Sequence, residues 1–391
     1  MKKITKKFIS TVLLCTVLAS CSNSSPSHKI PLEQSNCPVS TMRTGTRRQI
    51  KSISNGFECT QEGSYFMYDG SGGGSWLLYI DHGSDTVIKL CGRPDCTHTD
   101  SDCNAYFKEA ENICYYDGFL YTFNERNTFD LTDKDLIRMN LDGTERTVVY
   151  NTAKFMKTNG YNKILNSNIL NGVLFFMVGK LNEYGETVFN NGYYKLDGSM
   201  DEPKLDTFFA LVLFSDGESI VGNVDYDKEN ELWVNGIWDP DKGIVEELFK
   251  TDDINDYSYI GTKSHYYVEN GVIIEDSYTE GKKELIDTGL KGDYRLACFP
   301  DCIAMYEKGP YEEKNIYFYD WDYNYLGSVK INYEFNEEKM IGFICGETPD
   351  RIFLTDDFHC LPRYYINKSD FGSDNIEIHA LNVPDFGEEE Y

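Results

Sequence analysis

The sequence predicts an all-β protein, a β-propeller most consistent with seven blades of four antiparallel strands. Tyr (29) and Phe (23) are abundant and Pro (11) is scarce, which suits pleated, half-buried strands. Short apolar runs separated by Asp-Gly, Asn-Gly or Gly-rich turns return about every forty to fifty residues, the length of a four-stranded blade. Seven such units lie within the range that closes a ring. A multi-sheet sandwich is the alternative, and few helices are expected.

Residues 1–20 have the pattern of a lipoprotein signal peptide. Four lysines precede an apolar run from Phe8 to Ala19, and small residues lead to Cys21. The run is too short for a stable membrane span. The ending Leu18-Ala19-Ser20-Cys21 resembles the bacterial lipobox, which implies diacylglycerol on Cys21 and an anchor at the outer face of the bacterial cell membrane. An ordinary secretory signal with an incidental cysteine is the alternative.

Residues 21–56 are polar and predict a lipidated, flexible tether. Removal of the signal, with its four lysines and no acids, takes the formal charge from -27 to -31. Such a surface repels phosphate backbones and anionic lipid. We therefore expect no nucleic-acid partner, attachment to the membrane through the lipid alone, and a glycan or a protein as the ligand.

Residues 57–391 carry the seven predicted blades. Asp-Gly and Asn-Gly pairs match the twist of two-residue hairpins, and they occur at 117–118, 142–143, 171–172 and 270–271. The strand-like runs of the seven units are, in order, 65–68, 76–80 and 86–90; 113–116, 119–123, 136–140 and 147–150; 173–178 and 193–196; 211–214, 219–224 and 232–238; 266–269 and 272–275; 303–306, 316–319 and 326–331; and 340–345, 351–355, 364–367 and 376–381.

One of these runs also carries a family resemblance. The segment Leu136-Ile137-Arg138-Met139-Asn140-Leu141-Asp142-Gly143-Thr144 resembles the repeat of TolB-like and YWTD-like extracytoplasmic propellers. The resemblance implies the fold and no particular activity, because propellers host many functions.

A Cys/His-rich insertion is predicted at 91–107, between the first two units. Cys91, Cys96, His98 and Cys103 have the spacing C-x4-C-x-H-x4-C, and three sulfurs with one imidazole can close a tetrahedral structural zinc site. Disulfides are equally natural outside the cytoplasm, with Cys59 or Cys114 as further partners. Metal, disulfide and free thiol all stay open.

The same insertion carries a second resemblance. Its run from Leu90-Cys91-Gly92-Arg93-Pro94-Asp95-Cys96-Thr97-His98 to Cys103-Asn104-Ala105-Tyr106-Phe107 is similar to a cysteine-rich element in propeller lipoproteins of gut-dwelling Firmicutes. That resemblance suggests a family without implying a function.

The sequence contains no G-x-S-x-G elbow, no H-E-x-x-H and no phosphate loop, so it identifies no catalytic residue. We interpret the chain as a cell-surface lipoprotein that binds a ligand or protein partner through one face of the propeller. The alternative is an extracellular carbohydrate-active enzyme, a hydrolase or lyase, with carboxylates at the propeller channel.

Overall fold

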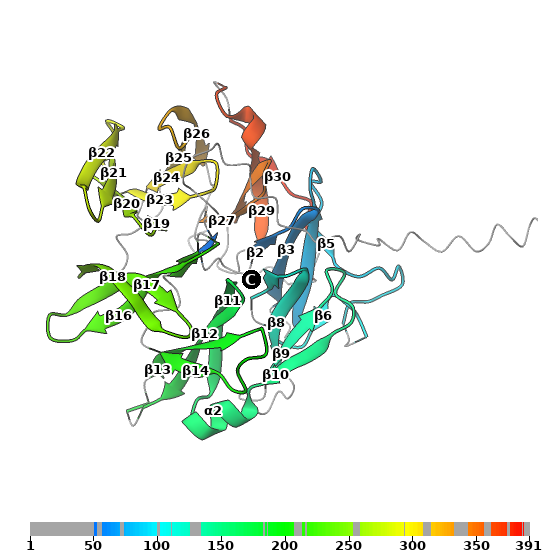
Figure 1. Cartoon of the computed structure of the whole chain (residues 1–391). Helices are drawn as coiled ribbons and strands as arrows, with labels where there is room; N and C mark the ends of the chain where they lie inside the picture. The colour runs from blue at the N-terminus through cyan, green and yellow to red at the C-terminus, as the bar shows by residue number, and fades with distance from the viewer. Residues whose placement is uncertain are drawn as a thin grey trace, which may run out of the picture.

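Seven antiparallel sheets stand around a common centre, as Figure 1 shows. The computed structural model describes residues 51–52, 57–70, 74–99, 102–110, 112–125, 134–182, 184–185, 187–206, 213–215, 217–252, 259–292, 294–307, 314–331, 343–355, 361–373, 376–384 and 386. The predicted signal peptide, Cys21 and most of the predicted tether lie outside these residues. Each blade contains four consecutive strands, so the predicted all-β propeller of seven four-stranded blades is confirmed.

The strands run from the innermost to the outermost position of each blade in chain order. Blade 1 has β2 (Phe57–Cys59), β3 (Gly63–Gly70), β4 (Gly74–Asp81) and β5 (Ile88–Lys89), and blade 2 has β7 (Cys114–Tyr116), β8 (Phe119–Glu125), β9 (Lys134–Met139) and β10 (Thr147–Asn151). Blade 3 has β11 (Lys163–Leu170), β12 (Val173–Leu181), β13 (Thr187–Lys195) and β14 (Lys204–Asp206), and blade 4 has β15 (Leu213–Ser215), β16 (Ile220–Asp227), β17 (Leu232–Asp239) and β18 (Gly243–Thr251). Blade 5 has β19 (Tyr259–Ile260), β20 (Ser264–Glu269), β21 (Val272–Ser277) and β22 (Gly281–Asp287), and blade 6 has β23 (Tyr294–Cys298), β24 (Ile303–Glu307), β25 (Lys314–Tyr319) and β26 (Tyr325–Ile331). Blade 7 has β27 (Phe343–Glu347), β28 (Arg351–Thr355), β29 (Pro362–Asn367) and β30 (His379–Ala380).

Helix is scarce, as the sequence predicts. The helical segments of the described residues are α2 (Ala153–Asn159), between blades 2 and 3, and the 3-10 turn η2 (Lys368–Asp370) in blade 7. None of the helices described is long and apolar enough to cross a membrane.

Three of the predicted two-residue turns join consecutive strands: 117–118 and 171–172 join the first and second strands of blades 2 and 3, and 270–271 joins the second and third strands of blade 5. Both residues of the pairs 117–118, 171–172 and 270–271 have positive φ, as the tight hairpin turn requires. The pair 142–143 lies instead in a wider connection from Met139 to Thr147. There Asp142 accepts a hydrogen bond from the backbone N–H of Thr144 at 3.0 Å.

Buried apolar clusters fill most boundaries between neighbouring blades. Separate clusters join blades 1 and 2, 2 and 3, 3 and 4, 5 and 6, 6 and 7, and 7 and 1. At the boundary of blades 4 and 5, Phe214 meets Tyr259 with ring centroids 5.6 Å apart, and a cavity lies between the outer strand β18 and blade 5. Burial between sheets is the main stabilising contribution in such a ring, and Phe214 packs against the apolar cluster of blades 5 and 6.

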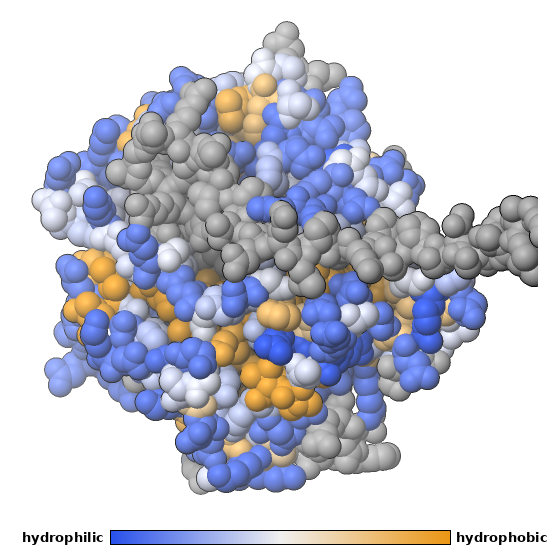
Figure 2. All heavy atoms as spheres, turned by 45° about the vertical axis from the view of Figure 1, so that its right-hand side comes forward, coloured by the Kyte–Doolittle hydropathy of each residue, from blue (hydrophilic) through white to orange (hydrophobic). Residues whose placement is uncertain are grey.

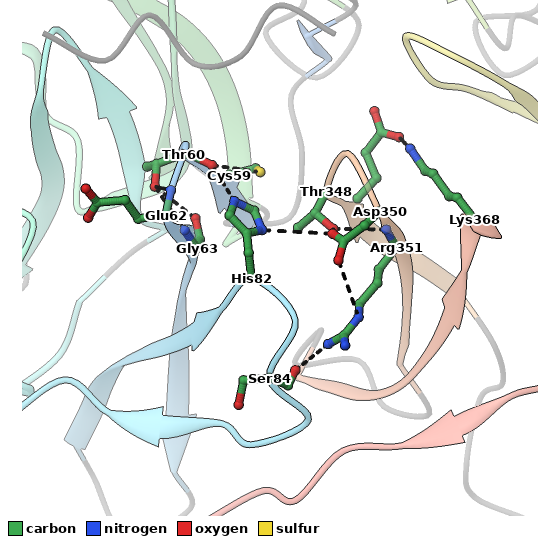
Figure 3. A network of polar contacts seen from close by, with 11 residues as sticks. Cys59, Thr60, Glu62, Gly63, His82, Ser84, Thr348, Asp350, Arg351 and Lys368 are labelled. Atoms are coloured by element: carbon green, nitrogen blue, oxygen red, sulfur yellow. Dashed lines mark hydrogen bonds and ion pairs between the residues drawn. The ribbon is translucent and has the colours of Figure 1, made fainter.

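Blade 7 meets blade 1 where the ring closes, and among the described residues no strand of either blade joins the sheet of the other. Phe57 packs on Phe353 at 5.2 Å, and the backbone of Asn382 exchanges hydrogen bonds of 2.7 and 2.9 Å with Asp85 and Val87. The Arg351 guanidinium donates to the carbonyl oxygen of Ser84, as Figure 3 shows. Side-chain and short backbone contacts therefore hold the two ends together.

Replacement of this arginine should weaken the closure. Arg351 is 8% exposed and also lies over the ring of Tyr365 at 4.2 Å. We expect Arg351→Met to lower the free energy of unfolding by about 1.5–3 kcal/mol, the loss associated with a hydrogen bond to a charged group. Urea unfolding of the mature chain measures it. An unchanged midpoint and slope would show that closure does not depend on this contact.

One described piece of the predicted tether is part of the propeller. The short strand β1 (Lys51–Ser52) pairs antiparallel with β15, the innermost strand of blade 4. In Figure 1 it is the small blue strand near the centre of the ring. The chain therefore reaches blade 4 before it enters blade 1 on the other side of the ring.

The part of the exterior that Figure 2 colours is mostly polar. Figure 2 shows hydrophilic side chains over most of the face in view, with hydrophobic side chains in smaller groups between them. Burial of the large apolar side chains between the blades leaves this polar exterior.

Candidate metal centre

The predicted insertion lies at the outer rim of blade 1. After β5, the short strand β6 (Tyr106–Phe107) pairs with the same strand, β4, that β5 pairs with. The backbone of Leu77 holds both ends of the intervening loop: its carbonyl accepts from Leu90 at 2.9 Å, and its N–H donates to Ala105 at 2.7 Å. The loop thus interrupts the outer strand of blade 1, and blade 2 begins only after it.

All four predicted ligands meet in this loop. The Sγ atoms of Cys91, Cys96 and Cys103 and a ring nitrogen of His98 lie within 4.8 Å of one another, and the three cysteines are free thiols. Tetrahedral zinc with Zn–S of about 2.3 Å and Zn–N of about 2.0 Å has donor separations of roughly 3.5–3.8 Å. The cluster could hold a metal after an inward movement of roughly 1 Å.

The electrostatics of His98 and Cys91 suit a cation. Burial, with the nearby charges of Lys89 and Arg93, lowers the pKa of His98, so the imidazole is neutral at pH 7 and has a lone pair to offer. Burial opposes ionisation of Cys91, but hydrogen bonds from the Arg93 backbone and from the Cys96 and Arg93 side chains outweigh it and lower the pKa of Cys91.

Cys103 behaves differently from Cys91. It is 1% exposed, and burial raises the pKa of its thiol to about 12. The thiol also lies 3.2 Å from Nδ1 of His98. A metal ion would have to displace the Cys103 proton, so binding must weaken as the pH falls.

Side chains outside the predicted set position the loop. The indole N–H of Trp76 donates to the His98 carbonyl at 2.9 Å, and Arg93 donates to Cys96 Sγ at 3.2 Å. Arg146 of blade 2 donates to the carbonyls of Cys103 at 3.3 Å and Tyr106 at 3.0 Å. Only Arg93, which lies between two cysteines, carried a signal in the sequence.

The further disulfide partners considered from the sequence lie elsewhere. Cys59 is on β2 and Cys114 is on β7, the innermost strands of blades 1 and 2, whereas the cluster is on the outer rim. Cys114 Sγ lies 3.6 Å from the carbonyl oxygen of Ser167.

No protein-family model matches the chain, and no curated protein matches it. Among solved structures, it is similar to an acylaminoacyl peptidase in complex with Z-Gly-Gly-Phe-chloromethyl ketone (TM-score 0.47, 9% identity, 86% of this chain and 51% of that one). It is also similar to the β-propeller domain of the Trilobed protease from Pyrococcus furiosus (0.46, 9%, 87% and 97%) and to a protein of Listeria monocytogenes EGD-e (0.36, 8%, 87% and 90%). The chain spans about half the length of the acylaminoacyl peptidase. At these identities the similarity is limited to the fold.

Proposed function

We propose that this chain is an extracellular lipoprotein that binds a ligand or protein partner through one face of its propeller. Diacylglycerol on Cys21 would anchor it to the outer face of the cell membrane, and residues 22–50 would carry the ring away from the bilayer. The tether leads to β1 on blade 4. A cavity of about 450 Å³ between blades 4 and 5 carries the binding proposal, since small-molecule sites occupy roughly 300–1,000 Å³.

The binding face is the one on which the first-to-second and third-to-fourth strand connections of every blade lie, and we call it the turn face. The cavity opens between two such connections of blade 5, at Lys263 and Tyr278. A rigid sheet scaffold that presents ligand-contacting residues from its connections is a general arrangement in binding proteins. The enzyme alternative, with carboxylates at the channel, stays a prediction.

The Cys/His cluster is proposed as a structural zinc site. Three sulfur donors and one imidazole fill a four-coordinate shell and leave no position for a substrate. The ligands all come from one loop at the rim, and the loop ends meet at Leu77. When bound, zinc would cross-link the loop, while Arg93 and Trp76 orient Cys96 and His98.

Lipid anchoring has a direct test. We expect metabolic labelling with a palmitate analogue to mark the wild-type protein and to leave Cys21→Ser unlabelled, because the thiol is the acceptor of the lipid. Cys298→Ser is the matched control, since Cys298 lies on β23 of the propeller. Equal labelling of the wild type and Cys21→Ser would contradict the anchor.

A further inference from the structure

The cavity between blades 4 and 5 has walls from four different strands. β18 lines it on the blade 4 side, and the ends of β20, β21 and β22 line it on the blade 5 side. The hydroxyl groups of Thr262, Ser264, Ser277 and Thr279 line it together with one aromatic ring, Tyr278. Such a wall offers many small donors and acceptors around a single apolar platform.

Tyr278 is a fixed platform. Its ring stacks on Phe249 at 5.4 Å and 20°, and on His265 at 5.8 Å and 16°. Its hydroxyl donates to the Gly261 carbonyl at 2.9 Å. Contacts at both the ring and the hydroxyl hold one rotamer, so a ligand that packs on the ring need not order it.

Glu275 is an oriented acceptor beside that platform. Ser264 Oγ donates to Glu275 Oε1 at 2.9 Å, and the Tyr266 hydroxyl donates to the same oxygen. Oε2 makes no hydrogen bond to the residues that the structure describes. A carboxylate held in this way can accept from a ligand hydroxyl in a charge-assisted hydrogen bond.

The charges around the cavity balance, in contrast to the acidic chain as a whole. Three lysines face three glutamates: Lys263, Lys282 and Lys283 with Glu246, Glu275 and Glu280. A strongly charged ligand of either sign meets as many repelling as attracting groups here. The cavity therefore favours a neutral ligand with many hydroxyl groups.

We propose that the cavity between blades 4 and 5 binds a neutral saccharide, with one C–H face of a sugar ring on Tyr278 and a hydroxyl on Glu275. An aromatic ring matches the apolar face of a pyranose, and hydroxyl and carboxylate groups match its rim. The inference rests on the proposed binding function and specifies its ligand class.

The test is binding of the full mature protein, in detergent, to an array of neutral, uronic-acid and amino-sugar oligosaccharides. We expect binding to neutral oligosaccharides. Tyr278→Ala should raise the Kd at least about tenfold through loss of the ring contact, whereas Tyr278→Phe should retain affinity. Glu275→Gln keeps an acceptor for Ser264 and should weaken binding several-fold. Tyr184→Ala, in a side chain 80% exposed on blade 3, is the control that leaves the Kd unchanged.

Three results would overturn the inference: binding to charged oligosaccharides alone, an unchanged Kd in folded Tyr278→Ala and Glu275→Gln proteins, or no saccharide bound. Amine cross-linking on intact cells distinguishes a wrong ligand class in this cavity from a wrong proposal that the protein binds a partner through the turn face. If the wild type binds no saccharide but cross-links through Lys263 to an envelope protein, the saccharide is excluded and binding through the turn face stands. If neither occurs, both proposals fail.

Discussion

Lys368→Met is expected to lower the free energy of unfolding by roughly 3 kcal/mol, near the lower end of the range for a broken buried ion pair. Lys368 is 8% exposed, and its Nζ lies 2.5 Å from Glu347 and 2.9 Å from Asp301. Figure 3 places it on the blade 7 side of the polar network. Burial acts against the ammonium, but the carboxylates of Glu347 and Asp301 outweigh it and raise the pKa of Lys368. Methionine would leave the Glu347 charge without its cation.

The loss of unfolding free energy in Lys368→Met should depend on pH. Burial raises the pKa of Glu347 from 4.5 to about 7, although the Lys368 charge opposes this shift. Because the folded-state pKa exceeds the unfolded one, protonation of Glu347 stabilises the fold below about pH 4.5, and this contribution is lost as the pH rises through about 7. The defect of Lys368→Met should therefore be largest above pH 7 and shrink toward pH 5.

Urea unfolding at pH 5 and pH 8 measures this dependence. Lys154→Met is the matched control, because Lys154 pairs with Glu202 on the exposed surface and exposed pairs contribute little. The Glu347→Gln/Lys368→Met double variant should recover much of the loss at pH 8. A defect of equal size at both pH values, or one as small as that of the control, would contradict the buried pair.

His98→Asn and Cys103→Ser are expected to abolish metal retention while the ring stays folded. His98 has φ 57°, and asparagine tolerates this left-handed backbone without supplying an imidazole. The apolar clusters that join blade 1 to blades 2 and 7 contain none of the four donor residues, so the loss of order should be confined to the loop between β5 and β6. Hydrogen exchange and limited proteolysis should show faster exchange and new cleavage there, with little change in the unfolding temperature.

Cys298→Ser is the control for these variants, since Cys298 is a half-buried cysteine of blade 6 outside the cluster. It should retain the metal. Disulfides in place of a metal centre would give a different result. Exchange and cleavage in the loop would then increase only on addition of reductant and would not change in His98→Asn.

Much of the fold could be predicted from the sequence because consecutive strands pair with each other through short turns of recognisable sequence. The residues of 117–118, 171–172 and 270–271 adopt positive φ in hairpins, and the flanking apolar runs are strands. Several outer and inner strands were missed because they are short or polar. β14 has three residues, β19 has two, and β22 is largely exposed, so none has the apolar pattern that marks a half-buried strand.

The four donor residues of the candidate metal site could be predicted from the sequence, but the strands and side chains that hold their loop could not. Cys91, Cys96, His98 and Cys103 lie close in the sequence, so their spacing alone suggested a cluster. The split of the outer strand around Leu77 and the contacts from Arg146 depend on pairing with β4 and on the neighbouring blade. The cavity at Tyr278 could not be predicted from the sequence either, because its walls come from two blades.

The most direct measurement is the zinc content of the mature protein purified without chelator, combined with mass mapping of its cysteines. We expect about one zinc per chain, consistent with a single four-donor structural site, and free thiols at Cys91, Cys96 and Cys103 after the metal is stripped. Protein without metal, in which those cysteines map to disulfides, would contradict the structural zinc site.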